Sequence, residues 1–179
     1  SYQTPLEEIR EAGYKGIIFT GGPNSVYDER SPRYQKEILD LGIPVLGICY
    51  GAQLMTYLAG GTVASAKDAA GEVASEYGAT TVRVDTGSAL FKGLEKDQQV
   101  WMSHTDYIAV PPAGFHITAA STHCPCAAME NPKRGLYAVQ FHPEVMHSLQ
   151  GQEMLRHFLF DVCGCSGDWQ MASFVDGAV

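Results

Sequence analysis

The chain has 179 residues, of which 45% are hydrophobic and 18% charged, and its formal net charge is -8. This length can bury one good core, so we expect a single domain. The acidic balance excludes nucleic acid as a natural partner, because it repels phosphate backbones. The apolar runs, such as 42–47, are far shorter than the roughly 20 residues of a membrane helix, so we expect no membrane span.

The cysteines indicate a reducing compartment. There are five, an odd number, and the pairs Cys124/Cys126 and Cys163/Cys165 are spaced poorly for closing internal loops. Structural zinc usually requires a C-x(2–4)-C spacing, which neither pair has. The opening residues also lack a basic stretch followed by an apolar one. We therefore predict a cytoplasmic protein with unpaired thiols and no metal.

The first elements read as a helix followed by a buried strand. Thr4 and Glu7 have the spacing of a capping box, with Pro5 at the first helical position, which predicts a helix that ends near Ala12. The short apolar run at 16–20 precedes a Gly-Gly-Pro turn and is typical of a strand covered on both faces. An α/β domain rarely begins on a helix, so we expect that preceding elements are missing.

The rest of the first half continues this rhythm. It contains a predicted helix, a buried strand and another helix, at 31–42, 43–48 and 53–59. Such alternation predicts right-handed crossovers and a parallel sheet with helices on its faces.

The second half changes character. Four stretches alternate in hydrophobicity and predict further strands, several of them antiparallel, at 80–84, 99–103, 116–121 and 136–141. A final amphipathic helix is expected over 151–162.

Cys49 lies where the buried strand meets the next helix, in the sequence Gly47-Ile48-Cys49-Tyr50-Gly51. A sharp strand-to-helix turn requires tight backbone packing on both sides, which favours glycine two positions before and after the nucleophile. The helix N-terminus favours a thiolate there. The pattern predicts a reactive cysteine, although the pentapeptide alone also suits a buried cysteine between two glycines.

His142 and Glu144 supply the expected partners of that thiol. At a strand end, residues two apart point to the same side, and Pro143 fixes the backbone between them. A carboxylate bonded to one imidazole nitrogen leaves the other nitrogen to accept the thiol proton. A surface histidine beside an acidic residue is the simpler interpretation, and the cysteine motif argues against it.

Gly21-Gly22-Pro23 directly follows the first predicted strand. This sequence suits a tight turn. It also suits an oxyanion hole, in which the N–H of Gly22 and the N–H of Tyr50 stabilise a tetrahedral intermediate.

The three motifs, in this order, resemble those of the class I (triad) glutamine amidotransferases. The resemblance implies a three-layer, flavodoxin-like α/β fold with a mostly parallel central sheet, additional antiparallel strands and a missing N-terminal strand-helix-strand. It implies hydrolysis of L-glutamine through a Cys49 thioester, with release of ammonia and with no cofactor in this domain. The residues expected to bind glutamine are Gly21, Gln53, Ser103, His104 and Asp106.

Three further segments are similar to the glutaminase domain of the GMP synthase family: Tyr77-Gly78 after the acidic run at 72–76, residues 100–106, and the tail at 158–169. In that family the Ser-His-x-Asp loop borders the glutamine pocket, chiefly through backbone groups. Many relatives have glycine where this chain has Thr105. The resemblance implies a glutaminase domain over 1–162 and a linker over 163–179, so that Cys163 and Cys165 are linker cysteines.

That family also implies the partners. The ammonia would pass to a synthetase (ATP-pyrophosphatase) domain, which uses ATP and magnesium to convert XMP to GMP and through which the whole enzyme forms a homodimer. We hypothesise that His142 and Glu144 require that domain to reach their working geometry. Two alternatives stay open: a catalytically silent docking domain, and a stand-alone cysteine hydrolase of similar fold.

Overall fold

The computed structural model describes residues 2–65 and 75–168, so the predicted acidic run at 72–76 and the predicted tail lie partly outside the described residues. The helices and strands follow one another in this order: α1 (Leu6–Glu11), β1 (Ile17–Phe19), η1 (Lys36–Asp40), β2 (Val45–Ile48), α2 (Tyr50–Leu58), β3 (Thr62–Ser65), β4 (Glu76–Val84), β5 (Asp97–His104), β6 (Asp106–Val110), β7 (His116–Ala120), β8 (Ala128–Asn131), η2 (Pro132–Arg134), β9 (Leu136–Val139), α3 (Gly151–Arg156) and η3 (His157–Val162).

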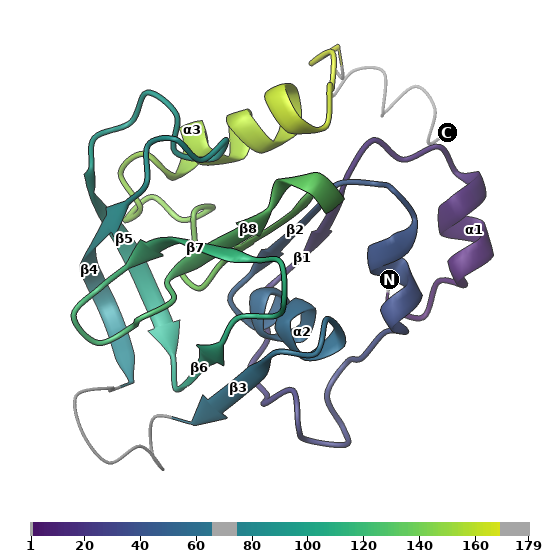
Figure 1. Ribbon diagram of the computed structural model, residues 1–179, viewed down its shortest axis with the longest axis horizontal. Coiled ribbons are helices and arrows are strands. Elements are labelled where there is room, and N and C mark those ends of the chain that lie inside the picture. Colours follow the sequence, from purple (N-terminus) through teal and green to yellow (C-terminus); the bar gives the residue numbers. More distant parts are fainter. Residues whose placement is uncertain (1, 66–74, 169–179) are drawn as a thin grey trace, which may run out of the picture.

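A seven-stranded sheet in the order β1-β2-β9-β8-β7-β4-β5 forms the centre of the molecule (Figure 1). The pairs β1–β2 and β2–β9 are parallel. The pairs β9–β8, β8–β7, β7–β4 and β4–β5 are antiparallel. The expectation of a mostly parallel sheet is therefore wrong for the described residues, in which only the part that carries the cysteine motif is parallel.

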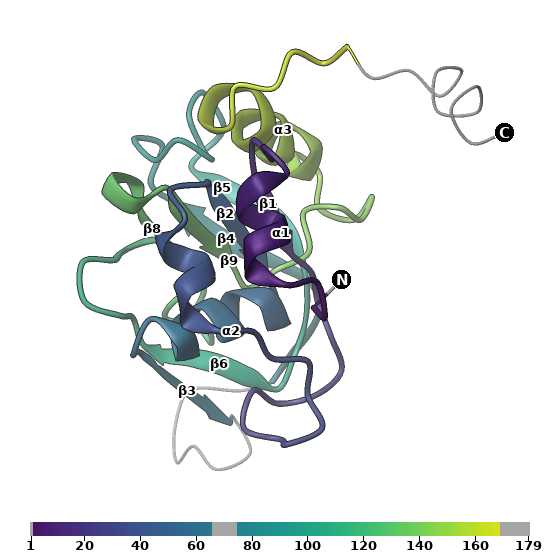
Figure 2. The same ribbon diagram turned by 90° about the vertical axis from the view of Figure 1, so that its right-hand side faces the viewer.

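Helices cover both faces of this sheet. The side chains of β2 and β9 alternate between the two faces: Val45 and Leu136 pack in the cluster that contains Met55 of α2, whereas Leu46 packs in the cluster that contains Met154 of α3. Figures 1 and 2 show α2 and α3 on opposite sides of the sheet, with the small β3–β6 sheet beyond α2. The layered arrangement places the end of β2 and the start of α2 together.

The N-terminal helix begins differently from its prediction. Pro5 occupies the N-cap position of α1, and no side chain caps the helix. The predicted capping box of Thr4 and Glu7 is therefore wrong. The backbone carbonyl of Thr4 instead accepts a hydrogen bond from the Tyr34 hydroxyl, which joins this segment to the one before η1.

Two further predictions in the first half need correction. β1 was expected to be covered on both faces, but Ile18 is 41% exposed. The helix expected over 31–42 is reduced to the short 3₁₀ helix η1. Side-chain bonds from Arg33 to the carbonyl of Val26 and from Tyr34 to Thr4 hold the preceding residues outside a helix.

The remaining elements follow the sequence more closely. The four strands predicted in the second half are confirmed as β4, β5, β7 and β9, and the final helix as α3 continued by the π-helix η3. The helix predicted from Gln53 begins earlier, at Tyr50. The strands β3, β6 and β8 were not predicted. None of the helices in the described ranges 2–65 and 75–168 has the length and apolar character needed to cross a bilayer.

Candidate active site

Cys49 is held in a strained backbone turn between β2 and α2. Its φ of 52° and ψ of -110° make it the only non-glycine residue with positive φ among those described. A methyl group on Gly47 would lie 2.6 Å from the carbonyl oxygen of Gly51, and one on Gly51 would lie 2.0 Å from that of Phe19. The glycine requirement predicted on both sides of the cysteine is therefore confirmed, because backbone atoms fill both spaces.

His142 follows the end of β9 and is held by its backbone. Its N–H donates to the carbonyl of Trp101, at 2.9 Å, and its own carbonyl accepts from the hydroxyl of Ser148. The imidazole Nδ1 lies 2.7 Å from Oε1 of Glu144. A carboxylate can only accept, so Nδ1 carries the proton and Nε2 is left for the thiol.

The thiol of Cys49 and the imidazole of His142 are in contact. The hydrogen bond with Cys49 is the largest of the effects that raise the pKa of His142 to about 9; burial opposes it and the bond with Glu144 adds to it. Cys49 is 5% exposed, and its Sγ also lies 3.7 Å from the carbonyl oxygen of Ser103. The sulfur is thus placed between an imidazole and a backbone carbonyl.

The Gly21-Gly22-Pro23 turn lies against this pair. A methyl group on Gly21 would come within 3.0 Å of Cε1 of His142 and 3.7 Å of Cβ of Cys49, and one on Gly22 within 3.4 Å of the Tyr50 ring. Tyr50 is the first residue of α2, where backbone N–H groups have no partner within the helix. The two N–H groups predicted as an oxyanion hole therefore belong to neighbouring residues beside the thiol.

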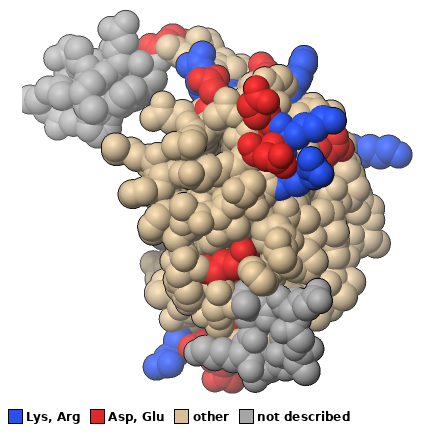
Figure 3. All heavy atoms as spheres, turned by 90° about the vertical axis from the view of Figure 1, so that its left-hand side faces the viewer, with Lys and Arg blue, Asp and Glu red and all other residues tan. Residues whose placement is uncertain are grey.

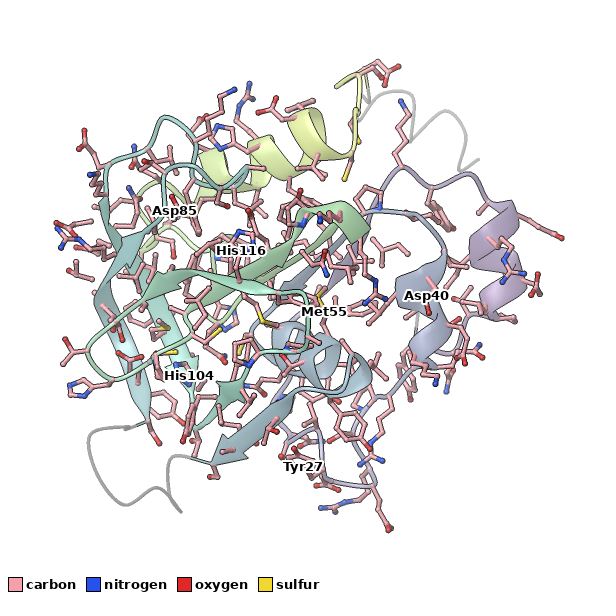
Figure 4. The ribbon with its side chains drawn as sticks, viewed as in Figure 1. Tyr27, Asp40, Met55, Asp85, His104 and His116 are labelled. Atoms are coloured by element: carbon pink, nitrogen blue, oxygen red, sulfur yellow. The ribbon has the colours of Figure 1, made fainter. Side chains whose placement is uncertain are left out.

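The segment 103–106 borders the site from the β5–β6 side. Gln53 is buried, and its amide donates to the carbonyl of Asp106, at 2.7 Å, and to Oε1 of Gln140, at 3.2 Å. The side chain of His104 points into the fold between β5 and β6 (Figure 4), and its Nδ1 also meets the carbonyl of Asp106. Of the residues predicted to bind glutamine, Ser103 contacts the sulfur through its backbone carbonyl, and Gly21 lies beside Cys49 and His142.

Two residues that support the site were not predicted. The hydroxyl of Ser148 accepts from the N–H of Trp101 and donates to the carbonyl of His142, so it joins the histidine loop to β5. A methyl group on Gly151 would lie 2.1 Å from the carbonyl oxygen of Pro143. No motif in the sequence marks either position, because each acts on a segment that only the fold brings near.

A cavity of about 610 Å³ lies on the other side of the Gly-Gly-Pro turn. Its lining includes Gly21, Gly22 and Tyr50, together with Tyr14 and Tyr34. Cys49 and His142 are not among its lining residues. This cavity therefore does not open on the thiol.

Within residues 2–65 and 75–168, one cluster of side chains has donors suited to a metal ion: Glu76, His104 and Cys124, whose ligand atoms lie within 4.8 Å of one another. All five cysteines are free thiols. Figure 3 shows Lys and Arg side chains beside Asp and Glu side chains, and no continuous basic track crosses the coloured part of that face. The predicted lack of a metal stays a prediction.

The family model for class I glutamine amidotransferases matches residues 1–162, and the chain belongs to that family. The names of its relatives are more specific than the name of the family. The chain is 57% identical over 175 residues to the GMP synthase (glutamine-hydrolysing) of Clostridium botulinum, 55% identical to that of Clostridium perfringens, and 49% identical over 178 residues to that of Ruminiclostridium cellulolyticum. These matches cover 98–99% of the chain and 33–34% of the relatives, so it spans about one third of their length.

Solved structures agree on the fold. A protein from Thermoplasma acidophilum that was assigned as one of the subunits of a GMP synthase superimposes with a TM-score of 0.72 at 29% identity, over 97% of this chain and 80% of its own. A glutamine amidotransferase from Thermotoga maritima superimposes with a TM-score of 0.69 over 90% of this chain and 81% of its own; at 20% identity it supports the fold alone. The class I fold expected from the motifs is confirmed.

Proposed function

We propose that this chain hydrolyses the side-chain amide of L-glutamine to glutamate and ammonia. The observation that carries the proposal is the placement of His142 between the Cys49 thiol and the Glu144 carboxylate. Below its pKa of about 9 the His142 imidazole holds the proton taken from Cys49, so the sulfur attacks the amide carbon as a thiolate and His142 then gives that proton to the departing ammonia. Water, deprotonated by His142, attacks the thioester and releases glutamate and the thiol.

The surrounding groups would stabilise and orient the substrate. The N–H groups of Gly22 and Tyr50 would donate to the oxyanion, which typically contributes on the order of 10²–10³ in rate for each donor. The glutamine would be bound next to Cys49 by the residues predicted for its pocket: Gly21, Gln53, Ser103, His104 and Asp106. Because Gln53 and the imidazole of His104 are buried, we assign them to shaping the pocket.

We further propose that the ammonia is used in GMP synthesis in the cytoplasm. The support is the 57% identity to a GMP synthase of which the chain spans one third. A synthetase domain would use ATP and magnesium to convert XMP to GMP, and would carry the homodimer contact. Residues 1–162 would form the glutaminase domain and 163–179 a linker to the synthetase.

Glutamate release distinguishes this function from a silent docking domain. We expect the chain to release glutamate from glutamine, faster when the synthetase part of a GMP synthase is added, and Cys49→Ala to lower the rate by roughly 10³-fold or more. Cys165→Ala, which removes a partly exposed thiol outside the site, is the control and should retain the rate. Glutamate release that survives in Cys49→Ala would refute the assigned nucleophile, and its absence from the unsubstituted chain in both conditions would favour the docking domain.

The stand-alone cysteine hydrolase requires a separate test. Such an enzyme would cleave peptides or esters and would respond little to glutamine. Incubation of the chain with a peptide library and with glutamine, followed by product analysis, decides between them. Peptide cleavage that depends on Cys49, without release of glutamate, would overturn the proposal.

A further inference from the structure

A buried pair of ionisable side chains lies beneath the segment 103–106. Glu76 is at the start of β4 and His104 at the end of β5, and they are 7% and 4% exposed. Oε2 of Glu76 and Nε2 of His104 are 3.5 Å apart, and neither atom has a hydrogen-bond partner in the described part of the chain. An arrangement of this kind is costly unless a hydrogen bond joins the two atoms, which requires a proton between them.

The other ring nitrogen of His104 decides where a proton must be. Nδ1 lies 3.1 Å from the carbonyl oxygen of Asp106. A carbonyl only accepts hydrogen bonds, so Nδ1 carries a proton. In a neutral ring, the lone pair of Nε2 would then face the carboxylate of Glu76. A second proton, on Nε2, converts this repulsion into an ion pair.

The surroundings of Glu76 suit its charged form. Its Oε1 accepts a hydrogen bond from the Ser121 hydroxyl, at 3.0 Å. The oxygen of Ser121 accepts in turn from the backbone N–H groups of His123 and Cys124. The pKa of the Cys124 thiol is strongly raised, first by burial and then by the charge of Glu76, so this thiol stays neutral. His104 is therefore the cation that faces the carboxylate.

We propose that Glu76 and His104 form a buried carboxylate–imidazolium pair that positions the segment 103–106 against Cys49. This proposal rests on the proposed glutaminase function. His104 holds the carbonyl of Asp106, which also accepts from Gln53 of α2. The carbonyl of Ser103, next to His104, accepts from the Cys49 thiol. The pair touches no substrate; it fixes the backbone that does.

A proton fits this place better than a metal ion. The ligand atoms of Glu76, His104 and Cys124 lie within 4.8 Å of one another, and a metal would need the thiolate of Cys124. Burial and the charge of Glu76 both oppose that thiolate. The proton requires only the two groups that already face each other.

The protonation of His104 can be measured directly in the unsubstituted chain. In a long-range ¹H–¹⁵N NMR spectrum at pH 7, we expect both ring nitrogens of His104 to carry protons, with the signal assigned from His104→Gln. In Glu76→Gln only Nδ1 should remain protonated, because the amide N–H donates to Nε2. A single ring proton in the unsubstituted chain overturns the pair, and stoichiometric zinc in the purified chain replaces it by a metal site.

Kinetics test the positioning role. Glu76→Ala should lower kcat/KM for glutamine roughly 10- to 100-fold, because small displacements of positioning groups are costly, and Glu76→Gln should recover most of it. The matched control is Glu130→Ala, which removes a buried glutamate of β8 that is bonded to His116 of β7. This substitution should leave kcat/KM near the unsubstituted value. Equal losses in Glu76→Ala and Glu130→Ala, or no recovery in Glu76→Gln, would refute positioning. An unsubstituted chain that releases no glutamate either alone or with the synthetase part of a GMP synthase would refute the glutaminase function, while the NMR result still decides the pair.

Discussion

Cys49 and Cys124 occupy two regions that contain the same kinds of groups in a different order. Both thiols are buried, and each lies near an imidazole and a carboxylate. At Cys49 the imidazole of His142 contacts the sulfur and the carboxylate stands behind it. At Cys124 burial, and then the charge of the adjacent Glu76, raises the pKa of the thiol. The order in which thiol, imidazole and carboxylate contact one another, rather than the presence of all three, decides which thiol can become a nucleophile.

The backbone separates the two regions as well. Cys49 has a positive φ and precedes the first turn of α2, where backbone N–H groups have no partner within the helix. Cys124 closes a turn in which its N–H donates to the Ser121 hydroxyl and its carbonyl accepts from the Ser121 N–H. The N–H and carbonyl of Cys49 are paired too, with the carbonyl of Val139 and with the N–H groups of Ala52 and Gln53. The difference is that Cys49 adjoins the first turn of a helix, whose N–H groups lack partners within the helix, whereas Cys124 adjoins a closed turn.

The largest expected difference between the two regions is in reactivity. A glutamine-analogue electrophile should label Cys49 stoichiometrically and at least about 100-fold faster than Cys124 in the folded chain, because only Cys49 has an imidazole to accept its proton. Peptide mass spectrometry after timed labelling measures both rates. Cys126, whose pKa is raised to about 12 by burial, is the internal control. Equal labelling of Cys49 and Cys124 would contradict the comparison.

The backbone around Cys49 should tolerate an added side-chain atom less well than the backbone around Cys124. Gly51→Ala would place a methyl group 2.0 Å from the carbonyl oxygen of Phe19, an overlap that no rotamer change relieves. We expect a loss of about 3 kcal/mol in the free energy of unfolding in urea. Gly87→Ala is the control, since its methyl group meets only the flexible side chain of Asp85, and should change it by less than about 0.5 kcal/mol.

The carboxylate behind His142 should set the alkaline limb of activity. Glu144 contributes to the raised pKa of His142, so Glu144→Gln should move the fall of kcat/KM to below the pH of about 9 expected for the unsubstituted chain. The same raised pKa also makes stability depend on pH. The protonated imidazole stabilises the fold fully below about pH 6.5, and this contribution disappears as pH rises through about 9. Glu153→Gln, an exposed residue on α3, is the control. An unshifted limb in Glu144→Gln would separate Glu144 from His142.

The smallest effect is expected at the rim of the segment 103–106. The hydroxyl of Tyr77, a residue 68% exposed, is 2.7 Å from the Thr105 hydroxyl. Water can replace a hydrogen bond at such a site, so Tyr77→Phe should change kcat/KM by less than about twofold. A loss of tenfold or more in steady-state assays would show that this pair takes part in binding glutamine, unlike the buried Glu76–His104 pair.

Short-range patterns predicted the central parts of the site. The glycines around Cys49 and the spacing of His142 and Glu144 specify local backbone geometry, which a few neighbouring residues determine. Glu76 was not predicted as a partner of His104, because their contact depends on the register of β4 against β5. The same holds for Ser148, which acts on residues that are distant in the sequence.

The elements of the fold divide in the same way into those that local patterns predict and those that depend on distant contacts. The strands β4, β5, β7 and β9 have recognisable alternation, whereas β8 was missed because it buries the polar residues Glu130 and Asn131. These residues interrupt the apolar pattern, and Glu130 is compensated by Ser88 and His116. The helix predicted over 31–42 followed local propensity, which the bonds of Arg33 and Tyr34 to distant backbone groups override.

The loop after β9, which contains His142, also covers the edge of the strand against which it packs, β5. β5 is the last strand of the large sheet, and its outer edge is occupied by backbone bonds from His142 to Trp101 and from Leu149 to Gln99. A bare strand edge pairs readily with other chains. A movement of the whole loop that withdraws His142 from Cys49 would also break these backbone bonds and uncover the edge. Loss of the catalytic geometry and the onset of aggregation on heating are therefore expected to share one structural event.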